Sequence, residues 1–90
     1  MSMIGTSDIK VGQVVISKAG RDKEQFFVVL EVIDDRYLLL ADGKRRTLDN
    51  PKRKKAMHLQ KTHSLVDLKP EDRPLNDSYI RKQLSRFQEA

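Results

Sequence analysis

The stretch FFVVLEVIDDRYLLLADG, residues 26–43, holds two apolar runs separated by a polar break. The first run, Phe26–Ile33, is rich in β-branched residues and long enough for a central strand that is buried on both sides. Asp34–Arg36 ends it, and the second run, Tyr37–Ala41, predicts the next strand. Asp42-Gly43 then indicates a tight hairpin of type I′, in which both central residues need a positive φ. The stretch therefore predicts two neighbouring antiparallel strands.

Three further strands are predicted around this pair. Val11–Lys18 alternates loosely and leads into the turn AGRD, where Gly20 can take a positive φ without a steric penalty. After the hairpin, Lys44–Leu48 is predicted as a short and very basic fourth strand, and Asn50-Pro51 as a loop. Ala56–Thr62 alternates again and is predicted as the fifth strand.

Five short strands with closely spaced turns, and no helix between them, predict a mainly β fold: a small antiparallel barrel over residues 4–63. The chain has 90 residues, enough for one such domain. Most of its core is expected from Val15, Val28, Leu30, Val32, Leu38, Leu40 and Leu59. Met57 and Leu59 are also expected to anchor the basic stretch before them in the sheet.

The remainder predicts an irregular segment and a short helix. Residues 64–77 are punctuated by proline and balanced in charge, which is typical of a linker or a wrapping extension. Asn76 or Asp77 is suited to cap a helix over residues 78–89. The apolar stripe of this helix consists of Ile80, Leu84 and Phe87. Such a short helix is marginal alone, so we expect it to dock on the barrel, bind a partner or unfold. We expect the barrel to fold without residues 76–90.

The positive charge of the chain is concentrated in one segment. The net charge is +5, whereas residues 44–63 alone carry eight basic residues against one acidic residue, Asp49. This concentration is typical of a surface for an anionic partner, and nucleic acid is the commonest such partner. The alternative interpretation is a solvated run of charge that has no partner.

Other classes of function find little support. Cysteine is absent, which excludes disulfides and cysteine-ligated metals and is compatible with a reducing cytosol. The apolar runs are too short for a membrane span, and the N-terminus does not resemble a secretory signal. His58 and His63 would lie on opposite faces of a strand, which does not favour a shared metal. No catalytic triad or P-loop can be identified. We expect a cytoplasmic protein that is not an enzyme and has no cofactor.

The segment KVGQVVISKAGRDKEQFFVVLEVIDD, residues 10–35, resembles a KOW motif, a strand–loop–strand unit with a glycine near its eleventh position, here Gly20. Where KOW loops commonly carry a second glycine, this chain has Glu24 or Gln25. The continuation is similar to the ribosomal large-subunit family called fourteen-e in archaea and eukaryotes. Its "V-D-V-I-D" strand, "L-V-D-G" hairpin, basic segment and "H-L-x-x-T" strand read here VLEVIDD, LLLADG, KRRTLDNPKRKK and HLQKT. The chain looks most like the bacterial, Firmicutes-type branch of KOW-domain RNA-binding proteins.

The resemblance implies an SH3-like barrel that binds structured RNA, with ribosomal RNA or the large ribosomal subunit as the expected partner. RNA duplexes are recognised largely by shape and backbone, so a surface with few aromatic residues is sufficient. The candidate RNA-binding residues are Lys18, Arg21, Lys23, Lys44, Arg45, Arg46, Lys52, Arg53, Lys54, Lys55, His58 and Lys61. The competing function is a protein-interaction module that docks on a ribosomal or transcription partner through the barrel edge and through Ile80, Leu84 and Phe87.

Overall fold

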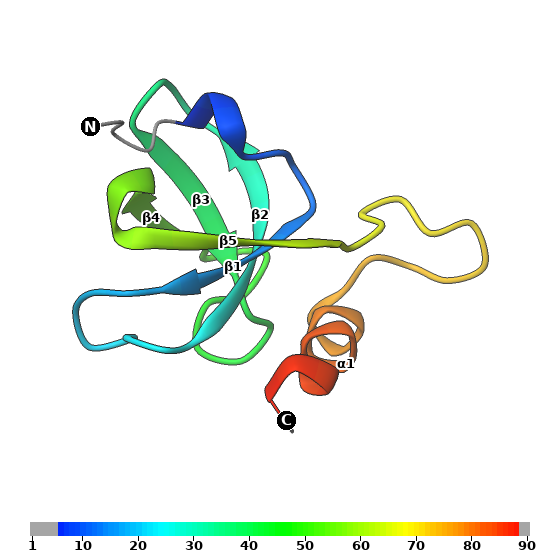
Figure 1. Cartoon of the computed structure of the whole chain (residues 1–90). Coiled ribbons are helices and arrows are strands. Elements are labelled where there is room, and N and C mark those ends of the chain that lie inside the picture. Colours follow the sequence, from blue (N-terminus) through cyan, green and yellow to red (C-terminus); the bar gives the residue numbers. More distant parts are fainter. Residues whose placement is uncertain (1–5, 89–90) are drawn as a thin grey trace.

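The computed structural model describes residues 6–88, which form one five-stranded antiparallel sheet followed by a helix (Figure 1). The strands are β1 (Gln13–Ser17), β2 (Phe26–Val32), β3 (Tyr37–Ala41), β4 (Lys52–Lys55) and β5 (Leu59–Leu65). Their order across the sheet is β4-β3-β2-β1-β5, which makes β2 central as its apolar run predicts. Two short 3₁₀ helices, η1 (Thr6–Asp8) and η2 (Ala56–His58), and the helix α1 (Asp77–Gln88) complete the fold. The predicted mainly β, barrel-like fold is confirmed.

Two predicted boundaries, the start of the barrel at residue 4 and the end of the helix at Glu89, lie outside the described residues. No helix within residues 6–88 has the length and apolar character that crossing a membrane requires. After β5, Val66 and Leu68 pack against the barrel, and the chain then swings away from it before it returns as α1 (Figure 1). β5 runs to Leu65, so the sheet extends two residues beyond the predicted end of the barrel.

The inner face of the sheet holds one of two hydrophobic clusters. Its buried members are Ile9, Val15, Phe27, Val29, Leu38, Leu40, Ala56 and Leu59. Alternate residues of a strand share a face, so β1, β2 and β3 each contribute from one side of the sheet. Full burial of a leucine or phenylalanine side chain stabilises the fold by roughly 1.5–3 kcal/mol. This face is the interior of the barrel.

Five of the seven predicted core residues are buried, namely Val15, Val28, Leu38, Leu40 and Leu59. Leu30 and Val32 are only half-buried. The pairing of β2 with β3 shifts register between Val29 and Glu31, and such an irregularity interrupts the alternation of side chains near the end of a strand.

The outer face of β1 and β2 is covered by α1 and by the segment after β5. Buried Val14 and Val28 point outward and pack in a second cluster with Ile80 and Leu84. The remaining buried members of this cluster are Val66 and Tyr79. At the end of the helix, the ring of Phe87 stacks on Phe26 with the ring centroids 5.7 Å apart. The helix therefore docks on the barrel, which was one of the three predicted outcomes.

The start of α1 is fixed by polar contacts. Asn76 Oδ1 accepts the backbone N–H of Tyr79 at 2.8 Å, so Asn76 is the N-cap. Asp77 Oδ1 instead accepts the N–H of Leu48, also at 2.8 Å, and ties the helix to the β3–β4 loop. Because α1 covers Val14 and Val28, we revise the expectation that the barrel folds without residues 76–90: their removal exposes one of the two clusters.

The fourth strand lies C-terminal to its predicted position at residues 44–48. Those residues form a loop in which the Asp42 carboxylate accepts the N–H groups of Lys44 and Arg46, both at 2.9 Å. The hairpin is not type I′, because Gly43 has a φ of +81° but Asp42 has no positive φ. Gly43 is also required sterically, since a Cβ there would collide with Asp77 and Arg81 of α1. The loop is therefore shaped by Asp42 and by the helix.

The fifth strand begins later than predicted because η2 precedes it. An extended chain would place Met57 and Leu59 on the same face, but the 3₁₀ turn separates them: Met57 is 54% exposed, whereas Leu59 is 2% exposed. The prediction that Met57 anchors the basic stretch is wrong. Ala56 and Leu59 do so instead.

The β1–β2 loop combines two left-handed residues. Gly20 has a φ of +84°, as its turn predicts, and Glu24 has a φ of +70°. Outside glycine this conformation costs roughly 1–2 kcal/mol. The carboxylate of Glu24 pairs with Lys18 at 3.0 Å, an exposed contact that contributes little to stability.

Candidate nucleic-acid interface

β4 consists of four basic residues, and its pairing with β3 decides where each side chain points. The opposed pairs are Lys52 with Leu40, Arg53 with Leu39, Lys54 with Leu38 and Lys55 with Tyr37. Directly opposed residues of an antiparallel pair share a face of the sheet. Lys52 and Lys54 therefore lie on the inner face beside two buried leucines, whereas Arg53 and Lys55 lie on the outer face.

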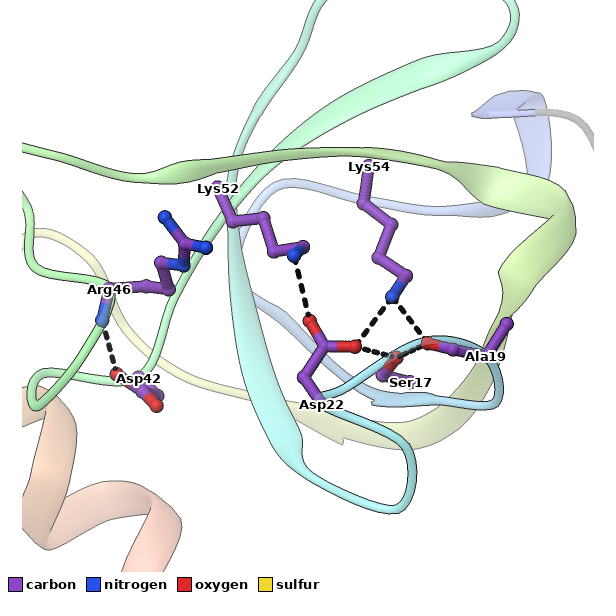
Figure 2. A network of polar contacts seen from close by, with 7 residues as sticks. All are labelled: Ser17, Ala19, Asp22, Asp42, Arg46, Lys52 and Lys54. Carbon is purple, nitrogen blue, oxygen red and sulfur yellow. Dashed lines mark hydrogen bonds and ion pairs between the residues drawn. The ribbon is translucent and has the colours of Figure 1, made fainter.

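Both inner lysines converge on Asp22 of the β1–β2 loop (Figure 2). Lys54 Nζ donates to Asp22 Oδ1 at 2.6 Å and to the carbonyl oxygen of Ala19 at 2.8 Å. Lys52 Nζ lies 3.3 Å from Asp22 Oδ2, and Ser17 Oγ donates to Asp22 Oδ1 at 2.7 Å. Only 8% of the Lys54 side chain and 16% of the Asp22 side chain are exposed. These contacts tie the β1–β2 loop to β4.

The surroundings keep the Asp22 carboxyl group ionised. Burial alone would raise its pKa, but hydrogen bonds from Lys54 and Ser17 and the ammonium group of Lys52 together lower the pKa to about 2. Lys54 is thus bound inside the fold and Lys52 is half-buried in the same cluster. Both were predicted to bind RNA, and Lys54 is sealed from an external ligand by these contacts.

The outer residues Arg53 and Lys55 surround the ring of Tyr37. Arg53 Cζ lies 4.2 Å from the ring centroid, and Lys55 Nζ lies 5.8 Å from it. Both cationic side chains are exposed. Within residues 6–88, neither lies within 4 Å of a carboxylate oxygen in an ion pair. We call these three residues the outer β4 patch.

Two loops carry further predicted cations. Lys44 and Arg45 are exposed in the β3–β4 loop, and Arg46 is half-buried there, with its side chain directed toward Lys52 in Figure 2. Arg21 and Lys23 are exposed on the loop that Asp22 ties to β4. Lys18, on the same loop, is paired with Glu24.

The other predicted residues lie on other elements. His58 is half-buried in η2, and its carbonyl oxygen accepts the N–H of Lys18 at 2.8 Å. Lys61 is exposed on β5, the strand at the opposite end of the sheet order from β4. Ile80 and Leu84 are buried against the barrel and Phe87 is half-buried, so the apolar stripe is used within the chain. The predicted residues therefore do not form one continuous set.

An apolar hollow lies elsewhere, beside the end of β5. It has a volume of about 480 Å³ and is lined by Val11, Leu65, Val66, Asp67, Leu68 and Lys69. Val11 and Leu65 are exposed there. No sequence pattern had marked this surface.

Sequence reasoning missed the roles of Asp22 and Tyr37. Asp22 was interpreted only as part of a turn, and Tyr37 as the first residue of a strand. The available signal was KRKK itself: if four consecutive basic residues form a strand against a core, two of them must point inward. A buried lysine requires an acidic partner, so a nearby aspartate was to be expected.

Compared with known protein families, the chain matches no family model. The outer β4 patch and its neighbouring loops carry the chemistry that indicates a function. Their exposed side chains include guanidinium and ammonium groups on a barrel-like sheet, an arrangement suited to an anionic ligand.

Proposed function

We propose that this protein is an RNA-binding module that contacts the backbone of structured RNA through the outer β4 patch and the two loops beside β4. The observation that carries the proposal is the exposure of Arg53 and Lys55 on a strand whose other two cations are bound inside. An arginine can bind two phosphate oxygens at once, while a lysine acts as a point charge.

The position of this patch on a sheet favours binding. β4 is paired with β3, and its two inner lysines are bound to Asp22, so the strand loses little conformational freedom when a ligand binds. Lys44 and Arg45 in one loop, and Arg21 and Lys23 in the other, extend the positive surface. With one tyrosine rather than several exposed aromatic rings, the surface suits backbone recognition of folded RNA better than stacking of single strands.

The resemblance to KOW-domain proteins and to the fourteen-e family supports the same function. On that basis we propose ribosomal RNA, or the large ribosomal subunit, as the partner of a cytoplasmic, non-enzymatic protein with a role in translation. The competing proposal of protein docking through α1 is less favoured, because Ile80 and Leu84 are buried against the barrel.

The direct test is fluorescence anisotropy with folded fragments of ribosomal RNA over a salt series. With four or five phosphate contacts, log K should fall against log salt with a slope of roughly −3 to −4.5. The double variant Arg53→Glu/Lys55→Glu should weaken binding on the order of 100-fold and flatten the slope.

The matched control is Lys69→Glu/Lys82→Glu, which changes the net charge equally at two exposed positions outside β4 and its loops. Its affinity should stay within about threefold of the wild type, because neither residue belongs to β4 or its two loops and salt weakens the interaction between exposed charges. Equal losses of RNA affinity in both double variants would show that net charge, rather than the outer β4 patch, determines binding. Absence of RNA binding by the wild type at low salt would overturn the proposal.

The RNA that the protein binds has to be identified by an experiment in cells. Crosslinking followed by sequencing of the bound RNA, together with co-sedimentation with large ribosomal subunits, tests the ribosomal part of the proposal. Crosslinks spread evenly over cellular RNA, with no co-sedimentation, would refute that part and leave general RNA binding in place.

A further inference from the structure

The geometry of the outer β4 patch is asymmetric. Tyr37 lies directly opposite Lys55 in the sheet register, yet its ring lies closer to Arg53, the diagonal neighbour. Diagonal neighbours in an antiparallel pair are within reach of aromatic and long side chains. With its Cζ 4.2 Å from the ring centroid, the guanidinium group of Arg53 lies over the ring in cation–π contact.

The ring itself is held in place. Asp34 Oδ1 accepts the backbone N–H groups of Arg36 and Tyr37, both at 2.8 Å, which fixes the turn where β3 begins. These two hydrogen bonds, with the positive charges of Arg53 and Arg36, lower the pKa of Asp34. The side chain of Tyr37 is half-buried, so the sheet restrains it as well.

We propose that Tyr37 is a positioning residue for RNA binding: its ring holds the guanidinium group of Arg53 in one plane, so that Arg53 and Lys55 bind the phosphodiester backbone as a preformed pair. This inference rests on the proposed function and names the chemical group that the site recognises.

The physical reason is the flexibility of arginine. A free arginine side chain carries about 2 kcal/mol of rotamer entropy, which binding must overcome. Stacking against Tyr37 restricts these rotamers before RNA arrives and leaves the N–H groups at the edge of the guanidinium plane free for phosphate oxygens. Arg53 and Lys55 are two residues apart on one face, roughly 6.6 Å along the strand, so both can reach one stretch of backbone.

Direct stacking of an RNA base on Tyr37 is the competing role for this ring. Arg53 lies over the ring and Tyr37 is only partly exposed, so little ring surface remains for a base. The two roles differ in one measurable respect: a positioning ring acts only through Arg53, whereas a stacking ring acts without it.

A double-mutant cycle separates them, with affinity for one folded ribosomal RNA fragment as the readout. Arg53→Ala should lower affinity and make the salt slope shallower by about one contact. Tyr37→Leu should lower affinity about two- to fivefold while leaving the slope unchanged, because no charge is removed. In the Arg53→Ala background, Tyr37→Leu should add no further loss.

Two conservative variants complete the test. Tyr37→Phe keeps the aromatic face and should bind as the wild type does. Arg53→Lys keeps the charge and the salt slope but lacks the planar fork, and should lose affinity to a similar extent as Tyr37→Leu. Melting curves confirm that each variant is folded at the temperature of the binding assay.

Each remaining outcome contradicts a different statement. If Tyr37→Leu has no effect, or Arg53→Lys binds as the wild type does, the positioning role is wrong and the proposed function stands. An equal loss with and without Arg53 would show that the ring contacts RNA itself. If Arg53→Ala has no effect at all, the outer β4 patch is not the binding surface, and the proposed function fails there too.

Discussion

Both faces of β4 carry basic side chains, but those of the inner face form contacts within the fold, whereas those of the outer face are exposed. On the inner face, Lys52 and Lys54 meet Asp22 and hold the β1–β2 loop against the barrel. On the outer face, one residue away along the chain, Arg53 and Lys55 are exposed around Tyr37. A run of basic residues is therefore not one functional unit when it lies in a strand, because alternate side chains point to opposite faces.

Burial explains the difference. An ion pair that is mostly withdrawn from water depends on both of its partners, and removal of either leaves an uncompensated charge. Exposed cations contribute little to folding, so they are free to bind a ligand. β4 is also the last strand at its edge of the sheet, where charged side chains discourage pairing with another chain.

The largest expected effect is on the free energy of unfolding, which should fall much more on substitution of an inner residue of β4 than of an outer one. Lys54→Ala should lower the free energy of unfolding by about 2–3 kcal/mol, because Asp22 loses its closest cation while Lys52 remains. Lys55→Ala, one residue away, should change it by less than about 0.5 kcal/mol. Urea unfolding of the two variants measures this difference, and equal stabilities would show that the inner lysine does not stabilise the fold more than the outer one.

The second effect concerns acid stability. The pKa of Asp22 is lowered to about 2 from a usual value of 3.8, so the carboxylate stabilises the folded state fully above about pH 4. This stabilisation, about 2 kcal/mol, should be lost as the pH falls from about 4 to 2. Asp22→Asn should lack this part of the pH dependence. Unfolding free energies of both proteins across that range provide the test, and parallel curves would contradict it.

The third expected effect is on RNA affinity, which should depend on the outer residues of β4 and not on the inner Lys54. Arg53→Ala and Lys55→Ala should each lower RNA affinity several-fold and reduce the salt slope by about one contact. Lys54→Ala should leave both unchanged at temperatures where it is folded, because its ammonium group contacts Asp22 rather than the surface. A salt series on all three variants decides the matter. An equal loss of slope in Lys54→Ala would mean that the inner face opens to RNA.

The smallest expected effect is on RNA affinity and concerns only the outer face of β4. Asp34→Asn removes a negative charge near Arg53, while asparagine can still accept the N–H groups of Arg36 and Tyr37. RNA affinity should rise about twofold at low salt, and the gain should vanish at high salt. A gain that persists at high salt would point to a change of shape rather than of charge.

Much of the barrel was predictable because its signals are local. β2 and β3 were placed to within one residue, since their apolar and β-branched runs are bounded by polar breaks. The start of α1 and its apolar stripe also followed from short-range spacing. Glu24 shows the limit of such signals: it has a φ of +70°, and residue type alone does not predict that conformation for a glutamate.

By itself, the sequence determined the mainly β class, the central position of β2, the capped C-terminal helix and the segment in which positive charge is concentrated. These features depend on residues close together in the chain, whose spacing sets which side chains can share a face. Only the tertiary structure decided that KRKK is a strand and that two of its lysines point inward. The partner that makes this possible, Asp22, lies 32 residues before Lys54, and a lysine can be buried only where the fold brings an acid to meet it.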